Sequence, residues 1–257
     1  MANIKYADPS YTDIPPTDDD KVMFRTAAGG DARGSIVQPK GYIDGLKMVY
    51  VSGTQVQLTP GAAYVPGPKR IAELASAVTL TPSLAANTWY HSYLTVSGST
   101  VGVEAVTTAP ASPYSGTARA KTGDTSRRYI GSFRTDAAGA IYNFRQSGTD
   151  IYYLANIFPA PFQVLANGSA STATSVSCAS VVPETARIAV LIATNSDPSV
   201  RADLWNSEGV MSMLFINGTN SNQARMALNA SQALIYAFAS TPSGVLNIRV
   251  SGYQYER

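Results

Sequence analysis

The sequence has very little of the chemistry that most catalytic and metal sites need. Its 257 residues include one cysteine, Cys178, and one histidine, His91. A single cysteine excludes an intrachain disulfide and a cysteine-ligated zinc, and a single histidine cannot complete a zinc or iron ligand set. We therefore expect no metal and no cofactor. Cys178 lies in an alternating apolar run, which predicts a small, buried, apolar side chain.

His91 is the only residue that could serve as the base of a Ser-His-Asp triad. It stands in the run Trp89-Tyr-His-Ser-Tyr, which is rich in aromatic residues and favours a strand. On a strand, Trp89, His91 and Tyr93 share one face. Because no catalytic motif surrounds it, we predict that His91 is a packed or hydrogen-bonded strand residue.

Charge is also scarce. Charged residues make up 14% of the chain, whereas about 25% is typical of globular proteins. This composition suits a β-rich protein whose surface is partly covered by neighbouring subunits. No segment is basic enough for a nucleic-acid surface, and no apolar run reaches the roughly 18 residues of a membrane span. The basic pairs Lys69-Arg70 and Arg127-Arg128 are predicted to be solvated loop charges, or else to face acidic polysaccharide or an acidic subunit.

What the chain does contain is a series of short strand signals separated by turns, which predicts an all-β fold. Residues 1–45 are polar and rich in Pro and Gly, with one small hairpin that turns at Gly29-Gly30. A hairpin of this size is marginal in water, so we expect an extended arm that docks on a partner. Residues 46–157 are predicted to form a β-rich middle module, and residues 158–257 a jelly-roll-like β-sandwich.

Individual elements can also be predicted. The Thr107–Ser126 segment is predicted to be a long loop, and Arg70–Ala77 is the best candidate for a short helix. A turn is predicted at Thr135–Gly139. In the last strand, Leu246, Ile248 and Val250 share one face while Tyr253 and Tyr255 have the other parity, which predicts a bulge at Ser251-Gly252. Strands are predicted at Lys21–Thr26, Arg33–Val37, Leu46–Val51, Thr54–Leu58, Ala62–Val65, Thr88–Val96, Thr100–Val106, Arg128–Arg134, Ala140–Phe144, Ser175–Val182, Arg187–Thr194, Arg201–Trp205, Val210–Ile216, Arg225–Leu228, Ala233–Ala239 and Val245–Glu256.

Paired carboxylates are the main route to an enzyme here, since glycosidases place two carboxyl groups across the scissile bond. The run Asp18-Asp19-Asp20 lies in the polar arm, where no cleft is expected. Asp197, Asp203 and Glu208 fall in or beside loops of the C-terminal region and could converge. No internal repeat of the kind found in solenoid depolymerases is present. We therefore predict no catalytic residues and no enzyme activity.

Other short motifs have structural explanations. The glycine-rich stretch Gly29-Gly-Asp-Ala-Arg-Gly lacks the strand-helix context and the Lys-Ser/Thr ending of a phosphate loop. Three matches to the glycosylation sequon, at Asn167, Asn217 and Asn229, are predicted to be turn residues.

Three stretches resemble bacteriophage tail fibre and tail structural proteins. The first runs from Asp20 to Ile36, and the third combines Val181-Val-Pro-Glu-Thr-Ala-Arg with Ile248-Arg-Val-Ser-Gly-Tyr-Gln-Tyr. The second and most specific covers about 46–146, with Leu58-Thr-Pro-Gly-Ala-Ala-Tyr-Val-Pro, Asn87-Thr-Trp-Tyr-His-Ser-Tyr-Leu and the stretch from Tyr114 to Gly139. The resemblance implies a homotrimer in the virion tail, made in the host cytoplasm, and it carries no catalytic residues. The chain has no coiled coil or extended shaft, which favours a short tail fibre, collar or baseplate protein.

The expected function is thus a structural part of a phage tail that joins other tail, collar or baseplate proteins through residues 1–45. The alternative is a receptor-binding protein whose C-terminal domain contacts host surface glycan. Trp205, Tyr236 and Tyr253 are candidate contacts, although core packing is the prediction for each. A glycan depolymerase is a third alternative. The long Thr107–Ser126 loop is the candidate for an intersubunit contact, and neither nucleic acid nor membrane insertion is expected.

Overall fold

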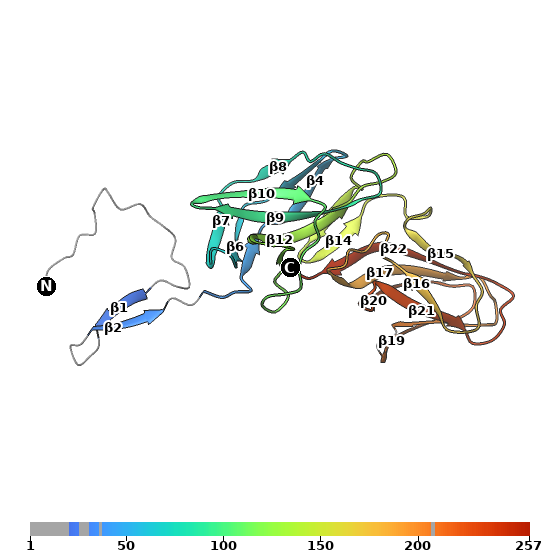
Figure 1. The fold of residues 1–257 in the computed structure, drawn as a ribbon. Coiled ribbons are helices and arrows are strands. Elements are labelled where there is room, and N and C mark those ends of the chain that lie inside the picture. The colour runs from blue at the N-terminus through green and yellow to red at the C-terminus, as the bar shows by residue number, and fades with distance from the viewer. Residues whose placement is uncertain (1–20, 26–30, 36–37, 207–208) are drawn as a thin grey trace.

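A computed structural model describes residues 21–25, 31–35, 38–206 and 209–257 (Figure 1). Within these ranges every regular element is a β-strand and every strand pairing is antiparallel, which confirms the predicted all-β fold. The described part of the chain contains no helix that is long and apolar enough to cross a membrane.

The predicted N-terminal hairpin is present. Strands β1 (Lys21–Arg25) and β2 (Asp31–Ser35) pair from Lys21↔Ser35 to Arg25↔Asp31. They form a two-stranded sheet of their own, joined to no other described strand. The Gly29-Gly30 turn and the remainder of the arm up to residue 20 lie outside the described residues.

The middle of the chain folds into three small sheets (Figure 1). Val56 and Leu58 alternate with Gln55 and Gln57 on one strand and are fully buried, as the period of a strand requires. Inward-facing side chains of all three sheets belong to one hydrophobic core. The sheets are β3 (Ile43–Gly45), β6 (Gly61–Val65) and β7 (Arg70–Leu74); β4 (Met48–Ser52), β5 (Gln55–Leu58) and β8 (Val78–Leu80); and β10 (Thr100–Val106), β9 (Trp89–Ser97), β12 (Asp124–Arg134) and β11 (Ala120–Lys121), each in spatial order.

The prediction of a helix at Arg70–Ala77 is wrong. This segment forms β7, which pairs with β6 from Gly61↔Leu74 to Val65↔Arg70. Arg70, Ala72 and Leu74 are buried while Glu73 is exposed, so the burial has the period of a strand. Eight residues are too few for a stable isolated helix, and pairing with β6 decides the outcome.

The predicted turn at Thr135–Gly139 is confirmed, but the strand predicted after it is not. The Asp136 carboxylate accepts hydrogen bonds from the amides of Ala138 (2.9 Å) and Ala140 (2.8 Å). The return segment makes one isolated bridge, Thr135↔Ile141. The next strand, β13 (Phe144–Ser147), instead pairs with β14 (Asp150–Tyr153).

The C-terminal part is a jelly roll. Its eight strands divide into two sheets of four, β15-β22-β17-β20 and β16-β21-β18-β19. This order is that of the double Greek key, so the jelly-roll prediction is confirmed. β15 was not among the predicted strands. The strands are β15 (Gln163–Gly168), β16 (Thr174–Ser177), β17 (Ala186–Asn195), β18 (Ala202–Asn206), β19 (Gly209–Ile216), β20 (Ser221–Ala227), β21 (Ala233–Phe238) and β22 (Leu246–Tyr255).

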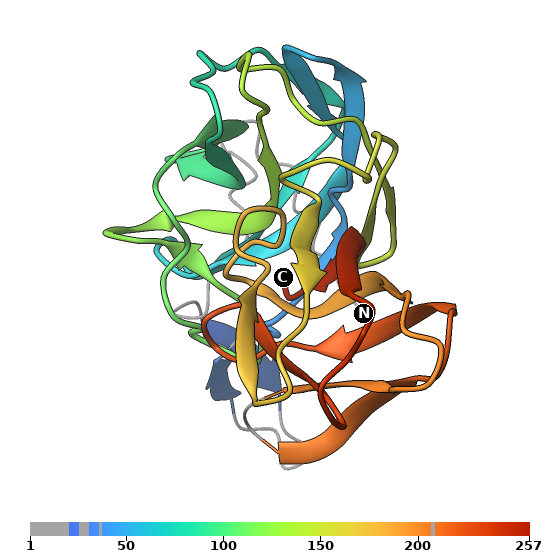
Figure 2. The ribbon, with the colours of Figure 1, turned by 90° about the vertical axis from the view of Figure 1, so that its right-hand side faces the viewer.

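The last strand, β22, joins the jelly roll to the rest of the chain. Its register against β17 shifts between Val250 and Gly252, which confirms the predicted bulge and leaves Ser251 unpaired. The first half of β22 pairs with β15 and the second half with β14. One sheet therefore contains residues from both sides of the predicted boundary at 157/158. The C-terminus lies between the middle sheets and the jelly roll (Figures 1 and 2).

Two of the basic residues predicted to be solvated are buried instead. Arg128 is fully buried, and its guanidinium lies 5.6 Å from the centre of the Tyr114 ring. Burial lowers the pKa of this guanidinium. Arg70 is also buried, and its Nη2 donates to the carbonyl of Gly98 at 3.1 Å. Both lie on strands, so their side chains point to the inner face of a sheet instead of into a loop.

The long segment after β10 is held by its own chain. The Tyr93 hydroxyl donates to the carbonyl of Thr108 (2.8 Å), and the Tyr114 hydroxyl donates to the carbonyl of Tyr64 (3.0 Å). Strand β11 and the start of β12 lie in its last seven residues. Its length therefore needs no second subunit to explain it, which removes the reason for expecting an intersubunit contact there.

Candidate functional site

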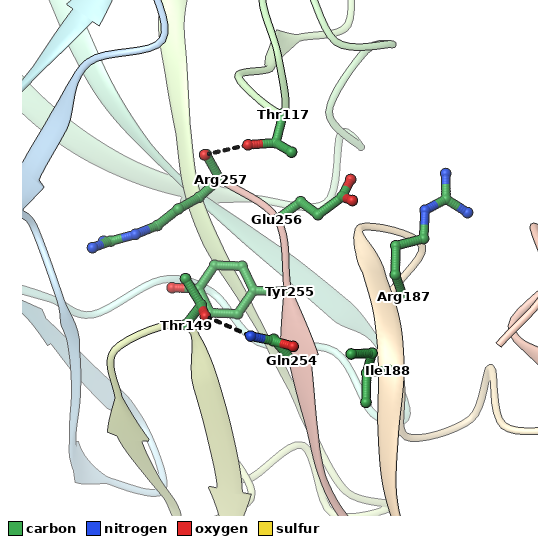
Figure 3. A pocket seen from close by; sticks show the side chains of 8 residues that line it. All are labelled: Thr117, Thr149, Arg187, Ile188, Gln254, Tyr255, Glu256 and Arg257. Atoms are coloured by element: carbon green, nitrogen blue, oxygen red, sulfur yellow. Dashed lines mark hydrogen bonds between the residues drawn. The ribbon is translucent and has the colours of Figure 1, made fainter. Parts of the chain in front are cut away.

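A hollow of about 350 Å³ lies where the end of β22 passes between the middle sheets and the jelly roll (Figure 3). Four separate segments line it: the loop before β11, the β13–β14 turn, the start of β17, and the end of β22. The lining residues are Thr117, Thr149, Arg187, Ile188, Gln254, Tyr255, Glu256 and Arg257.

Most polar groups around this hollow already have partners. Gln254 accepts a hydrogen bond from Arg225 (3.1 Å) and donates one to Thr149 (3.2 Å). The Thr117 hydroxyl donates to the carbonyl of Arg257 (3.0 Å), whose guanidinium donates to two further backbone carbonyls. Glu256 lies 3.7 Å from Arg119. Few polar groups here are left to bind a ligand, so we interpret the hollow as a gap at the boundary between the middle module and the jelly roll.

A buried chain of hydrogen bonds crosses the same junction. His91 Nδ1 lies 2.8 Å from Ser132 Oγ, which lies 2.8 Å from the Tyr129 hydroxyl, which lies 2.8 Å from Thr185 Oγ1. His91 and Ser132 come from the middle module, and Thr185 immediately precedes β17 of the jelly roll. All four side chains are buried. The prediction that His91 is a packed, hydrogen-bonded strand residue is confirmed.

This arrangement is unsuited to nucleophilic catalysis. A triad serine contacts Nε2 of its histidine and must reach the substrate. Here the serine contacts Nδ1, is almost fully buried, and is engaged a second time by Tyr129. A hollow of about 220 Å³ beside His91 is lined by Trp89, Glu184 and Gln232 among others, but no serine or cysteine lines it.

His91 should make the fold sensitive to acid. Burial lowers its pKa from the ordinary value of 6.5 to about 4. Between these values the unfolded chain binds the proton and the folded chain does not, so stability falls as pH drops from 6.5 to 4. The loss corresponds to about 3 kcal/mol, and it is absent above pH 6.5.

Because His91 is the only histidine, its pKa can be read directly from a single imidazole C–H resonance by NMR. The expected midpoint is near pH 4. Urea unfolding at a series of pH values should show the unfolding free energy of the wild type falling between pH 6.5 and 4. His91→Gln lacks the titrating imidazole, so the difference in unfolding free energy between it and the wild type should change over the same pH range. A midpoint near 6.5 would contradict the burial described here.

The candidate carboxylates do not form a catalytic pair. Asp197 is fully buried, and both of its oxygens accept hydrogen bonds from backbone amides. Asp203 is paired with Arg201 at 3.0 Å. Glu208 and Asp18-Asp19-Asp20 lie outside the described residues. Within the described part of the chain, no group of three His, Cys, Asp or Glu side chains is placed to hold a metal.

Among the candidate glycan contacts, Tyr236 and Tyr253 are buried in the core, and the Tyr253 hydroxyl donates to the carbonyl of Ser132 (2.9 Å). Core packing is confirmed for both. Trp205 is half-buried. Cys178 is fully buried, and burial raises the pKa of its thiol to about 12, as expected for an inert side chain. Asn229 is confirmed as a turn residue, because its Oδ1 accepts hydrogen bonds from the amides of Ser231 (3.0 Å) and Ala233 (2.9 Å).

One exposed feature was missed by the sequence reasoning. Phe215 on β19 is 44% exposed, and the Arg201 guanidinium lies 4.7 Å from its ring centre. Asp203, which lies opposite Phe215 in the sheet, holds that guanidinium. The alternation of the two strands could have indicated this outward cluster, but their pairing was unknown.

Fold and site together define an all-β protein that joins a small three-sheet module to a jelly roll through a buried polar and aromatic junction. No protein-family model matches the chain, and no curated protein matches it either.

Proposed function

We propose that this chain is a structural component of a bacteriophage tail, in a short fibre, collar or baseplate, that assembles as a homotrimer and docks through residues 1–45. The observation that carries the proposal is the β1–β2 hairpin, which forms a sheet of its own in front of a well-packed body. A lone two-stranded hairpin is marginal in water, so an external partner would stabilise it. The resemblance to phage tail proteins names the kind of partner.

The body behind the hairpin suits a mechanical role. The junction combines the hydrogen-bond chain from His91 to Thr185 with the Trp89 indole, whose Nε1 donates to the carbonyl of Ala179 (3.1 Å). β22 then continues from the jelly roll into pairing with β14. A continuous strand and a buried polar network resist bending between the two parts, as a load-transmitting subunit requires.

The test is to locate the chain in purified virions by mass spectrometry and cryo-electron microscopy, and to repeat this with a variant that lacks residues 1–37. Incorporation of the wild type and loss of the truncated variant, with an unchanged melting temperature of its body, is the expected result. Absence of the wild-type chain from intact particles would end the proposal, and normal incorporation of the truncated variant would remove the docking role of the arm.

A second candidate, glycan contact by the jelly roll, is favoured by the exposed Phe215 with its flanking Arg201–Asp203 pair. Aromatic rings beside fixed charged groups suit sugar rings and their hydroxyls. Purified protein should then compete with phage for adsorption to host cells. Adsorption that is unaffected by saturating protein would exclude this role.

A further inference from the structure

One sheet face of the middle module carries no charge. On the outer side of β4, β5 and β8, two rows each contain one Val, one Gln and one Thr, and we call these six residues the neutral face. Val49, Gln57 and Thr79 form the first row through direct strand pairing. The second row is less regular: Gln55 pairs with Ser52 across a register shift beside Val51, and its side chain bonds to Thr81, just beyond the end of β8.

The two valines are unusually exposed for apolar side chains on a sheet. Val49 is 42% exposed and Val51 is 46% exposed. Leu154, which is 59% exposed, lines a groove of about 250 Å³ together with Val49. Three of the six large apolar side chains that are exposed in the described residues therefore gather at this one place. Such clustering marks an interaction surface more than a solvated one.

Each of the other four sheets with described side chains carries outward charge. The jelly-roll sheets carry Arg225 with Asp150 and Arg201 with Asp203. The sheet of β9 and β12 carries Glu104 with Lys121, and β7 carries the exposed Glu73. Beside the six neutral residues, the exposed Lys47 precedes β4, and the exposed Arg145 lines the groove next to Val49 and Leu154. A neutral centre with a charged rim is the arrangement of protein interfaces.

The polar groups of the neutral face are fixed and self-complementary. Gln57 Nε2 donates to Thr79 Oγ1 and Gln55 Nε2 donates to Thr81 Oγ1, both at 3.2 Å. Each row thus presents a held amide oxygen as an acceptor and a threonine hydroxyl as a donor, beside one valine. A second copy of the same face would supply matching donors, acceptors and methyl groups, and no like charges would meet at a symmetry axis.

We propose that the neutral face is the contact through which copies of this chain associate. The occupant is a second copy of the chain, because the hydrogen-bonding groups and methyl groups of the six residues match those of another copy, and these six residues offer a charged partner nothing to pair with. A face that meets itself relates two copies by a two-fold axis, so this contact pairs copies of the chain and is separate from the threefold interface of the proposed homotrimer.

Disulfide trapping tests this contact on the full chain. Val51→Cys places a thiol on the neutral face and keeps both Gln–Thr hydrogen bonds, and Gln223→Cys places one on the exposed side of β20 as the matched control. The native Cys178 is fully buried and does not interfere. At equal protein concentration and with the same added oxidant, Val51→Cys should form disulfide-linked dimers at least about tenfold faster than the control, because association raises the local thiol concentration. Equal rates would overturn the proposal.

Sedimentation provides the second arm. The double variant Val49→Lys/Val51→Lys should weaken self-association by at least about a hundredfold, since it places like charges face to face. Ser221→Lys/Gln223→Lys, which adds the same charges to the jelly roll, should associate like the wild type. Matching melting temperatures of the variants show that both are folded. A monomeric wild type, or a Val49→Lys/Val51→Lys variant that associates normally, would refute the contact, whereas the tail location is decided separately by virion incorporation.

Discussion

A Gly252→Ala variant is expected to lose about 3 kcal/mol or more of folding free energy. Gly252 lies in β22 beside the bulge, between Tyr152 of β14 and Val190 of β17. A Cβ at this position would come within 2.3 Å of the Ile151 carbonyl oxygen and 3.3 Å of its carbon. These are backbone atoms of a paired strand, so they cannot rotate away as a flexible side chain does. The added methyl group must push β14 and β22 apart.

The loss would spread beyond the site, because the residues after Gly252 form the junction. Tyr253 and Tyr255 are buried there, and burial raises the pKa of Tyr255 to about 12, so its hydroxyl stays neutral. Urea unfolding measures the effect. Gly41→Ala is the control, since the nearest atom to its Cβ would lie at 3.9 Å, and it should change stability by less than about 0.5 kcal/mol. A wild-type unfolding midpoint for Gly252→Ala would mean that β14 does not pair with β22 as described.

Replacing Asp197 should lower the melting temperature by on the order of 10 °C. One carboxylate oxygen accepts hydrogen bonds from the amides of Ser199 (2.9 Å) and Val200 (2.6 Å), and the other from the amides of Ser243 (2.6 Å) and Gly244 (2.8 Å). The side chain thereby ties the β17–β18 loop to the β21–β22 loop. Asp197→Ala would leave these buried amides without an acceptor, which is costly away from water.

Asp197→Asn separates charge from shape. Backbone hydrogen bonds, led by that from Val200, hold the pKa of this carboxyl well below its ordinary value of 3.8. Its contribution to stability is therefore complete above that value and is lost as pH falls far below it. Asn keeps the size of the side chain but turns an amide donor toward backbone donors, so we expect most of the fall in melting temperature seen with Ala. The difference in melting temperature from the wild type should narrow in strong acid, where the Asp197 carboxylate becomes protonated.

Asp203→Asn is the matched control for this prediction. Its carboxylate pairs with Arg201, whose side chain is 49% exposed, and such pairs contribute less than about 1 kcal/mol. Thermal unfolding followed by circular dichroism compares the variants. If Asp197→Asn and Asp203→Asn melt together, the two loops are not held by the Asp197 carboxylate.

Local patterns in the sequence predicted features that one strand shows by itself. Leu246, Ile248 and Val250 followed by the opposite parity of Tyr253 and Tyr255 predicted both the buried face of β22 and its bulge, and both are present. Asp136 predicted its turn because its carboxylate bonds to amides only a few residues away. Such interactions join residues a few positions apart, so they can be predicted from a short stretch of sequence.

The errors share a long-range cause. Arg70–Ala77 has a composition that suits a helix as well as a strand, and only β6 beside it selects the strand. The basic pairs appeared solvated because charge usually is, yet Arg128 enters the interior under Tyr114, fourteen positions earlier in the chain. The candidate carboxylate Asp197 was placed in a loop correctly, but its partners at Ser243 and Gly244 come from a distant turn.

By itself the sequence therefore determined the all-β class, the jelly-roll character of its C-terminal part, and the burial of Cys178 and His91, because alternation and turn chemistry act over a few residues. Tertiary structure alone decided that β14 joins β22, that a hydrogen-bond chain from His91 to Thr185 closes the junction, and that valine, glutamine and threonine from three strands gather on one neutral face. The physical reason is that the packing of the whole chain selects which strands pair. The alternation within one strand predicts which of its faces is buried, but not which strand it pairs with.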